Sequence, residues 1–95
     1  MSNYVYILYS KKLDRFYTGF TQNFDLRMEF HRNPESRKFT AKANDWEVFM
    51  KIECSSKEQG LKVESHIKRM KSKKYIYNLK SYPEMQIKLL NKYTI

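Results

Sequence analysis

Five polar side chains stand at positions where the surrounding pattern predicts burial or a purely structural residue. Phenols and imidazoles can transfer protons, and a guanidinium binds anionic oxygen atoms. A carboxylate in an apolar setting is costly unless it is paired or binds a cation. These chemistries are therefore available if the fold brings the side chains together. The five residues are Tyr6, Tyr17, Arg27, His31 and Glu64.

The two tyrosines lie in runs that alternate and are rich in aromatic and β-branched residues, at 4–9 and 16–21. Such runs predict two strands, and the polar segment between them predicts a hairpin. Gly19 stands inside the second strand, where glycine costs stability and usually marks a bulge or a close backbone approach.

Arg27 and His31 lie four residues apart on a helix predicted over Phe24–Arg32, which begins after the N-cap Asn23. At 100° per residue both fall within an apolar arc, so we expect them to point toward the sheet. A snorkelling arginine and a packed histidine are the structural alternative. The apolar arc comprises Phe24, Leu26, Met28 and Phe30.

A third strand is predicted over 46–53, after a basic loop at 33–44. The loop has one aromatic residue, Phe39, which either stacks on a base or fixes the loop to the core. Phe49 indicates some burial on the second face of the strand. The alternation places four apolar side chains on one face: Trp46, Val48, Met50 and Ile52.

Glu64 lies on the longest predicted helix, which begins with a capping box near Ser55–Gln59 and ends near Met70 or Lys71. It projects into an apolar stripe, so it either pairs with Lys68 at i+4 or binds a cation. The two interpretations have equal weight on the residues alone. The stripe comprises Gly60, Leu61, Val63, Ile67 and Met70.

The end of the chain predicts shorter helical pieces. Residues 68–74 are strongly basic and suit either phosphate contacts or the negative end of a helix dipole. A turn or helix is expected over 74–79 and a last helix after Pro83. We therefore expect one α+β domain over residues 1–80, with 81–95 as a helical extension packed on it.

The totals fit one small basic domain. The chain has 95 residues and a formal net charge of +9, which suits a phosphate-bearing partner or, alternatively, a solvated surface. No apolar run approaches the roughly 20 residues that span a bilayer. The absence of a secretory signal pattern and the single cysteine predict a cytoplasmic protein.

The hairpin also resembles a known signature. Tyr4-Val5-Tyr6 and Tyr17-Thr18-Gly19 are similar to the paired motifs of the GIY-YIG nuclease family, with Tyr4 in place of the first glycine. The order of the predicted elements agrees with that family. The resemblance covers residues 3–80 and is nearest to small stand-alone members that resemble the N-terminal domain of the UvrC excision-repair subunit. It implies a three-stranded antiparallel sheet flanked by helices.

The resemblance also implies roles. Glu64 would bind one divalent cation, Mg²⁺ or Mn²⁺, and Arg27 would hold a phosphate oxygen. Tyr6 is favoured as the base that activates water and Tyr17 as a positioning group, although the sequence does not decide between them. His31 completes the catalytic set. Gly19 and Asn78 match further motif positions.

The implied function is metal-dependent hydrolysis of DNA phosphodiesters, in repair or related processing. The alternative is a weak or inactive module that binds nucleic acid. A family member without a sequence-reading domain would be unspecific, structure-selective or dependent on a protein partner. Six basic residues are candidates for contact with DNA: Lys11, Lys12, Arg37, Lys38, Lys68 and Lys71.

Overall fold

A computed structural model describes residues 2–32 and 45–94, with the backbone alone for residues 30–32. The three strands of this part form one antiparallel sheet in the order β2-β1-β3. This confirms the predicted α+β architecture. The elements are β1 Asn3–Ser10, β2 Arg15–Thr21, α1 Phe24–Arg32, β3 Glu47–Cys54, α2 Lys57–Met70, α3 Lys73–Ser81 and α4 Pro83–Lys92.

The predicted hairpin is present, and its turn is fixed by two aspartates. Asp14 adopts a left-handed backbone with φ 50° and accepts a hydrogen bond from the Tyr9 hydroxyl at 2.7 Å. Asp45, just before β3, accepts hydrogen bonds from the Ser10 hydroxyl at 2.6 Å and the Lys12 N–H at 2.8 Å. The tip of the hairpin is therefore held to the start of the third strand.

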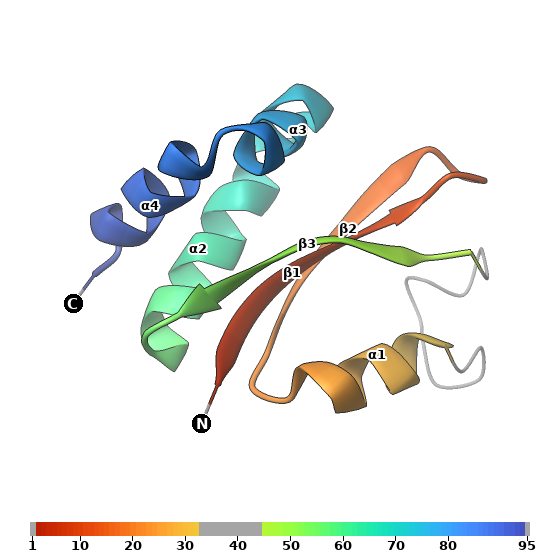
Figure 1. Ribbon diagram of the computed structural model, residues 1–95, viewed down its shortest axis with the longest axis horizontal. Coiled ribbons are helices and arrows are strands. Elements are labelled where there is room, and N and C mark those ends of the chain that lie inside the picture. Colours follow the sequence, from red (N-terminus) through yellow and green to blue (C-terminus); the bar gives the residue numbers. More distant parts are fainter. Residues whose placement is uncertain (1, 33–44, 95) are drawn as a thin grey trace.

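Helices cover both faces of the sheet (Figure 1): α1 lies on one side, and α2, α3 and α4 lie on the other. Successive side chains of a strand point to opposite faces. Val5 and Ile7 accordingly belong to the larger core, which includes Val63 of α2. Tyr6 and Leu8 belong to a smaller cluster with α1. The candidate tyrosine Tyr6 thus faces away from the main core.

The predicted alternation of β3 is wrong at one point. Ile7 pairs with Met50 but Leu8 pairs with Val48, so Phe49 is skipped in the register. A bulge of this kind reverses the side-chain pattern beyond it. Trp46 consequently packs against the cluster on the α1 side, and Val48 is 46% exposed instead of buried.

The predicted helix starts are confirmed. The Asn23 side chain accepts a hydrogen bond from the Leu26 N–H at 3.1 Å, and the Ser56 hydroxyl accepts one from the Gln59 N–H at 3.0 Å. Gln59 returns its side-chain oxygen to the N–H and hydroxyl of Ser55, one residue earlier than in a standard capping box.

The apolar stripes are narrower than predicted. Leu26, expected in the inward arc of α1, is 62% exposed. Leu61 and Met70 of α2 are 43% and 45% exposed, whereas Val63 and Ile67 are buried. A short helix that touches a small sheet buries only its central line of residues, so flanking positions remain in solvent.

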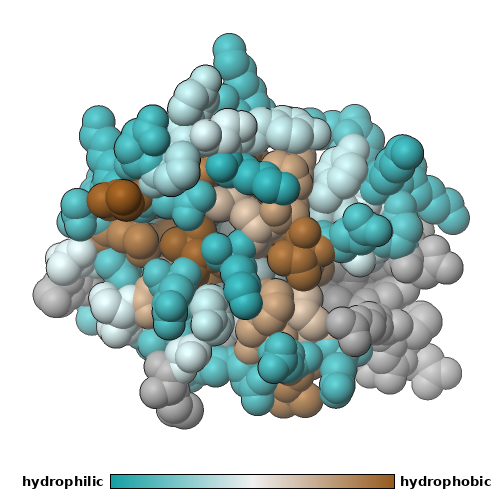
Figure 2. All heavy atoms as spheres, in the orientation of Figure 1, coloured by the Kyte–Doolittle hydropathy of each residue, from teal (hydrophilic) through white to brown (hydrophobic). Residues whose placement is uncertain are grey.

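The last two helices pack beside α2. Pro83 begins α4 at its first turn, as predicted, and Leu89 of α4 belongs to the main core. The Gln59 side-chain amide donates a hydrogen bond to the carbonyl of Leu90 at 2.9 Å. Hydrophilic side chains surround the apolar ones on the face seen in Figure 2. Within the described ranges, every helix is too short or too polar to cross a bilayer.

Candidate functional site

Tyr6 is the centre of the candidate site. Its side chain is 1% exposed, and its backbone lies opposite Gly19 in the hairpin. A Cβ built on Gly19 would overlap the Tyr6 hydroxyl and would lie 2.5 Å from Cζ of the ring. The glycine therefore supplies the space in which the phenol rests, which agrees with the predicted close approach.

Three other candidate groups influence the pKa of the Tyr6 hydroxyl. Burial raises the pKa of Tyr6 well above its ordinary value, and the Tyr17 hydroxyl raises it further. The Arg27 guanidinium opposes this rise in pKa, whereas the Glu64 carboxylate adds to it. The structure thus brings together groups from β1, β2, α1 and α2, within range of one hydroxyl.

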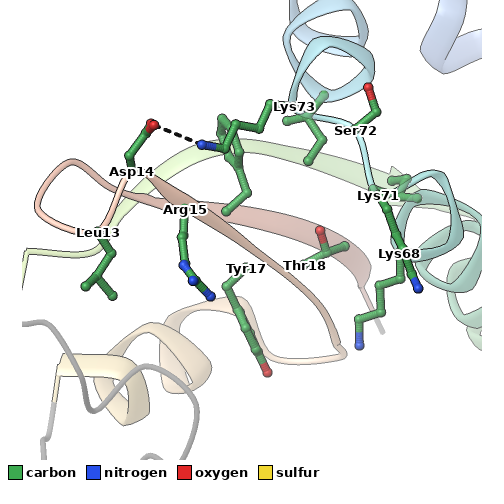
Figure 3. A pocket seen from close by; sticks show the side chains of 12 residues that line it. Leu13, Asp14, Arg15, Tyr17, Thr18, Lys68, Lys71, Ser72 and Lys73 are labelled. Atoms are coloured by element: carbon green, nitrogen blue, oxygen red, sulfur yellow. Dashed lines mark hydrogen bonds and ion pairs between the residues drawn. The ribbon is translucent and has the colours of Figure 1, made fainter.

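Tyr17 lies between the buried phenol and solvent. Its ring centroid is 6.3 Å from that of Tyr6, and the two hydroxyls share a hydrogen bond. Tyr17 is half-buried and lines an open recess of about 750 Å³ between β2 and the α2–α3 corner. Figure 3 shows Arg15 and Tyr17 extending to the same side of β2, with Lys68 approaching from α2.

Arg27 is more exposed than its predicted inward position required. It is an exposed residue of α1, while Met28 beside it is buried against Tyr6 and Leu8. The guanidinium nevertheless lies near enough to lower the pKa of Tyr6. An arginine at the rim of the smaller core can reach both solvent and the tyrosine pair, because its long stem spans that distance.

Glu64 is partly buried and ion-paired. Its side chain is 18% exposed, and its Oε2 atom lies 3.3 Å from Nζ of Lys68 one turn along α2. The ion-pair alternative weighed for this residue is therefore present. The pairing leaves a cation role untested, since an exposed lysine is an exchangeable partner for a carboxylate.

The donor set around Glu64 suits a sparsely held cation. Within the described ranges, no three His, Cys, Asp or Glu side chains gather as a metal-ligand cluster. A cation at Glu64 would therefore keep most of its ligands as water or substrate oxygens. Mg²⁺ commonly binds in this way, through one or two carboxylates and retained waters.

Several predicted residues lie elsewhere or outside the described side chains. The side chain of His31, and Arg37, Lys38 and Phe39 of the basic loop, fall outside the described residues. Lys11 and Lys12 are exposed at the hairpin turn. Asn78 lies in α3, and its backbone carbonyl accepts a hydrogen bond from the Tyr82 N–H at 2.9 Å. That hydrogen bond is part of the C-terminal cap of α3, and it involves the backbone of Asn78, not its side chain.

The tertiary structure adds two cations that the sequence did not single out. Arg15 begins β2, and Lys73 begins α3; both line the recess beside Tyr17, together with Lys68 and Lys71. Arg15 lies two residues before Tyr17 and so on the same face of the strand. That period-two spacing was the available sequence signal for Arg15.

Comparison with known proteins identifies the family and agrees with the fold. The chain matches the GIY-YIG catalytic domain over residues 2–78. It is similar to the UPF0213 protein BH0048 from Bacillus halodurans, whose solution NMR structure is 30% identical with a TM-score of 0.54. That alignment covers 85% of this chain and 84% of the other. No curated protein matches significantly. The chain belongs to the GIY-YIG family of nucleases.

Proposed function

We propose that this protein is a divalent-metal-dependent DNA endonuclease that hydrolyses phosphodiester bonds, in DNA repair or processing. One observation carries the proposal: the Tyr6 hydroxyl lies within electrostatic range of Tyr17, Arg27 and Glu64, which come from three other elements. A purely structural core would not need a guanidinium and a carboxylate within electrostatic range of a buried phenol.

Phosphodiester hydrolysis requires an activated water and stabilisation of the negative charge that develops on the phosphate. Arg27 is suited to hold a phosphate oxygen, because a guanidinium offers several donors in a planar fork. Arg15 and Lys68 lie on the same side of β2 as Tyr17 and add positive charge beside it.

The two tyrosines have different roles in this proposal. The raised pKa of Tyr6 makes the loss of its proton less favourable than for an ordinary phenol, so its hydroxyl acts as a hydrogen-bond donor. This argues against Tyr6 as the base, the role favoured on sequence grounds. Tyr17, which lines the open recess, is the better placed phenol to meet the attacking water. Tyr6 then orients Tyr17.

Glu64 is the residue proposed to hold the divalent cation. A bound Mg²⁺ or Mn²⁺ would supply Lewis-acid stabilisation of phosphate oxygens and would acidify water. To bind the cation, the Glu64 carboxylate must release Lys68. Because the ion pair is partly exposed to solvent, breaking it costs little free energy.

A second candidate is a nucleic-acid-binding module with weak or no turnover. The Glu64–Lys68 ion pair favours it, since a permanently paired carboxylate would not bind a cation. The same basic side chains would then serve only to bind. In either case DNA is the proposed partner, the single buried Cys54 suits a reducing cytoplasm, and a protein partner would add specificity.

The deciding experiment compares two glutamates of α2. Supercoiled plasmid and flapped DNA are incubated with the wild type, Glu64→Gln or Glu58→Gln, in Mg²⁺, Mn²⁺ or chelator. Glu58 is the matched control, because it also forms an i,i+4 ion pair, with Lys62 at 3.6 Å. We expect metal-dependent nicking that Glu64→Gln lowers at least about 100-fold and Glu58→Gln leaves unchanged.

Two results would contradict the proposal in different ways. Binding by all three proteins without cleavage would leave only the binding module. Cleavage that survives Glu64→Gln or chelation would show that the carboxylate does not support the reaction.

A further inference from the structure

The recess between β2 and the α2–α3 corner extends beyond Tyr17 to residues of α2 and α3. We call it the β2 recess. Its lining residues are Leu13 to Thr18 at the hairpin and β2, and Ile67, Lys68, Lys71, Ser72, Lys73 and Ile76 at the corner. Its volume of about 750 Å³ lies within the range of small-ligand sites, roughly 300–1,000 Å³. Since Tyr17 lines it, the recess is continuous with the candidate active site.

The walls of the β2 recess are cationic. Four basic side chains line it, against one carboxylate, Asp14. Asp14 is already paired with Lys73 at 2.9 Å, and both side chains are more than half exposed. An exposed pair of this kind is weak and can open to an anion. The four cations are Arg15, Lys68, Lys71 and Lys73.

The α2–α3 corner adds the partial positive charge of a helix N-terminus to that of the basic side chains. Lys71 ends α2 in a left-handed conformation with φ 48°, and Ser72 caps α3 by accepting a hydrogen bond from the Tyr75 N–H at 3.1 Å. The first turn of α3 therefore lies at the wall of the recess. A helix N-terminus carries partial positive charge, so it supports the binding of phosphate by the lysines beside it.

An aromatic cluster adjoins the recess. Phe16 lines it and packs edge-on against Phe49 and Tyr77, with centroid distances of 5.0 and 5.5 Å. Tyr77 of α3 is 47% exposed, which is unusual for a ring that is held in place by two others. A rigid, half-exposed ring costs little entropy when a base stacks on it.

We infer that the β2 recess binds a single-stranded DNA segment, with phosphates on its lysines and arginine and a base on Tyr77. Cationic grooves flanked by aromatic rings are the usual way in which proteins hold single strands. A duplex would offer no open base faces to Tyr77, because its bases are stacked and paired. The inference rests on the proposed function for the choice of DNA, and it names the substrate class as a flap or single-stranded tail.

The test measures binding in chelator, so that no cleavage is needed. Fluorescence anisotropy is recorded with a labelled single-stranded DNA, the duplex of the same sequence and the matching single-stranded RNA. Lys71→Ala and Arg15→Ala probe the phosphate contacts, and Lys88→Ala on exposed α4 is the charge-matched control. Tyr77→Leu removes the ring, Tyr77→Phe keeps it, and Tyr82→Leu is the exposed aromatic control.

We expect single strands to bind at least tenfold more tightly than the duplex. Lys71→Ala and Arg15→Ala should each weaken binding about fivefold at 50 mM salt and lower the slope of log K against log salt by about 0.7. Tyr77→Leu should weaken it at least about fivefold, because stacking on one ring is worth that much. Tyr77→Phe and both control variants should bind like the wild type.

Equal binding of duplex, or wild-type binding by the lysine, arginine and Tyr77→Leu variants, would overturn the inference. So would RNA that binds more than tenfold tighter than DNA. The proposed nuclease can fail separately: metal-dependent nicking with no effect of the recess variants on binding removes only this inference. Binding in the recess by a protein that never nicks DNA removes only the nuclease.

Discussion

Replacing Gly19 with alanine tests whether the position of the Tyr6 hydroxyl matters. The added Cβ would lie 2.5 Å from the Tyr6 Cζ, whereas carbon atoms in contact prefer at least about 3.5 Å. The ring must therefore move by about 1 Å. Gly19 has no positive φ, so the backbone accepts alanine and the clash is the main cost.

The magnitude follows from two opposing terms. Overpacking a tight site costs typically about 1–3 kcal/mol, and replacing a strand glycine with alanine returns about 0.5–1 kcal/mol. Because two atoms of the Tyr6 side chain overlap with the added Cβ, the upper part of the overpacking range, about 2–3 kcal/mol, applies. We expect a net loss of about 1–2.5 kcal/mol in the free energy of unfolding, which lowers Tm by roughly 4–20 °C. Because Tyr6 orients Tyr17 in the proposed mechanism, its shift would misplace Tyr17, and a misplacement of about 1 Å costs on the order of 100-fold in rate.

Thermal unfolding and plasmid nicking measure the two effects separately. Gly60→Ala is the matched control, because its Cβ would also collide with a ring, with Phe20 Cδ1 at 2.7 Å. Phe20 packs against the main core on the opposite face of the sheet, so nicking by the folded protein should be unchanged. Helix propensity favours this alanine by about 1 kcal/mol, which offsets part of the clash.

A Gly19→Ala protein that is folded, destabilised and as active as the wild type would refute the reasoning, because Tyr6 would then not need its observed position. Unchanged stability and activity together would show that the ring and the backbone do not approach as closely as described.

Two further predictions concern the supports of the site. Ser56→Ala should lower the free energy of unfolding by about 1 kcal/mol in urea titrations, because the Gln59 N–H loses its cap, while Ser65→Ala on the exposed side of α2 should not. The hydroxyl of Ser10 lowers the pKa of Asp45, so this carboxylate stabilises the fold above its unfolded pKa of about 3.9, and that stabilisation is lost as pH falls through the lower folded value. Asp45→Asn should therefore narrow the difference in Tm between pH 6 and pH 3, and an unchanged difference would contradict the assignment.

Much of the fold could be predicted because its signals are local. The hairpin follows from alternating aromatic and β-branched residues, and the caps Asn23 and Ser56 mark helix starts through hydrogen bonds to the next turn. The starting proline of α4 is also a local signal, because its fixed φ and missing N–H suit the first turn of a helix. Each cap joins residues within about four positions, and the alternation of each strand of the hairpin is contained in its own seven or eight residues, so a short window of sequence contains the signal.

The bulge in β3 had no such local cause. Skipping Phe49 lets its ring meet Phe16 and Tyr77, which belong to β2 and α3. The gain therefore depends on partners that lie far along the chain. For the same reason Leu26, Leu61 and Met70 could not be assigned to solvent from helical period alone, since the width of a buried stripe depends on what packs against it.

The sequence by itself determined which residues are available for chemistry: two tyrosines, an arginine, a histidine and a glutamate, spread over four predicted elements. Only the tertiary structure decided the burial, the ion pairing and the neighbours of these side chains. Burial of Tyr6 in the cluster on the α1 side raises its pKa, Lys68 pairs with Glu64, and Arg15 and Lys73 line one recess from a strand and a helix. Burial, charge and distance depend on how elements approach one another, and that approach is fixed by packing over the whole domain.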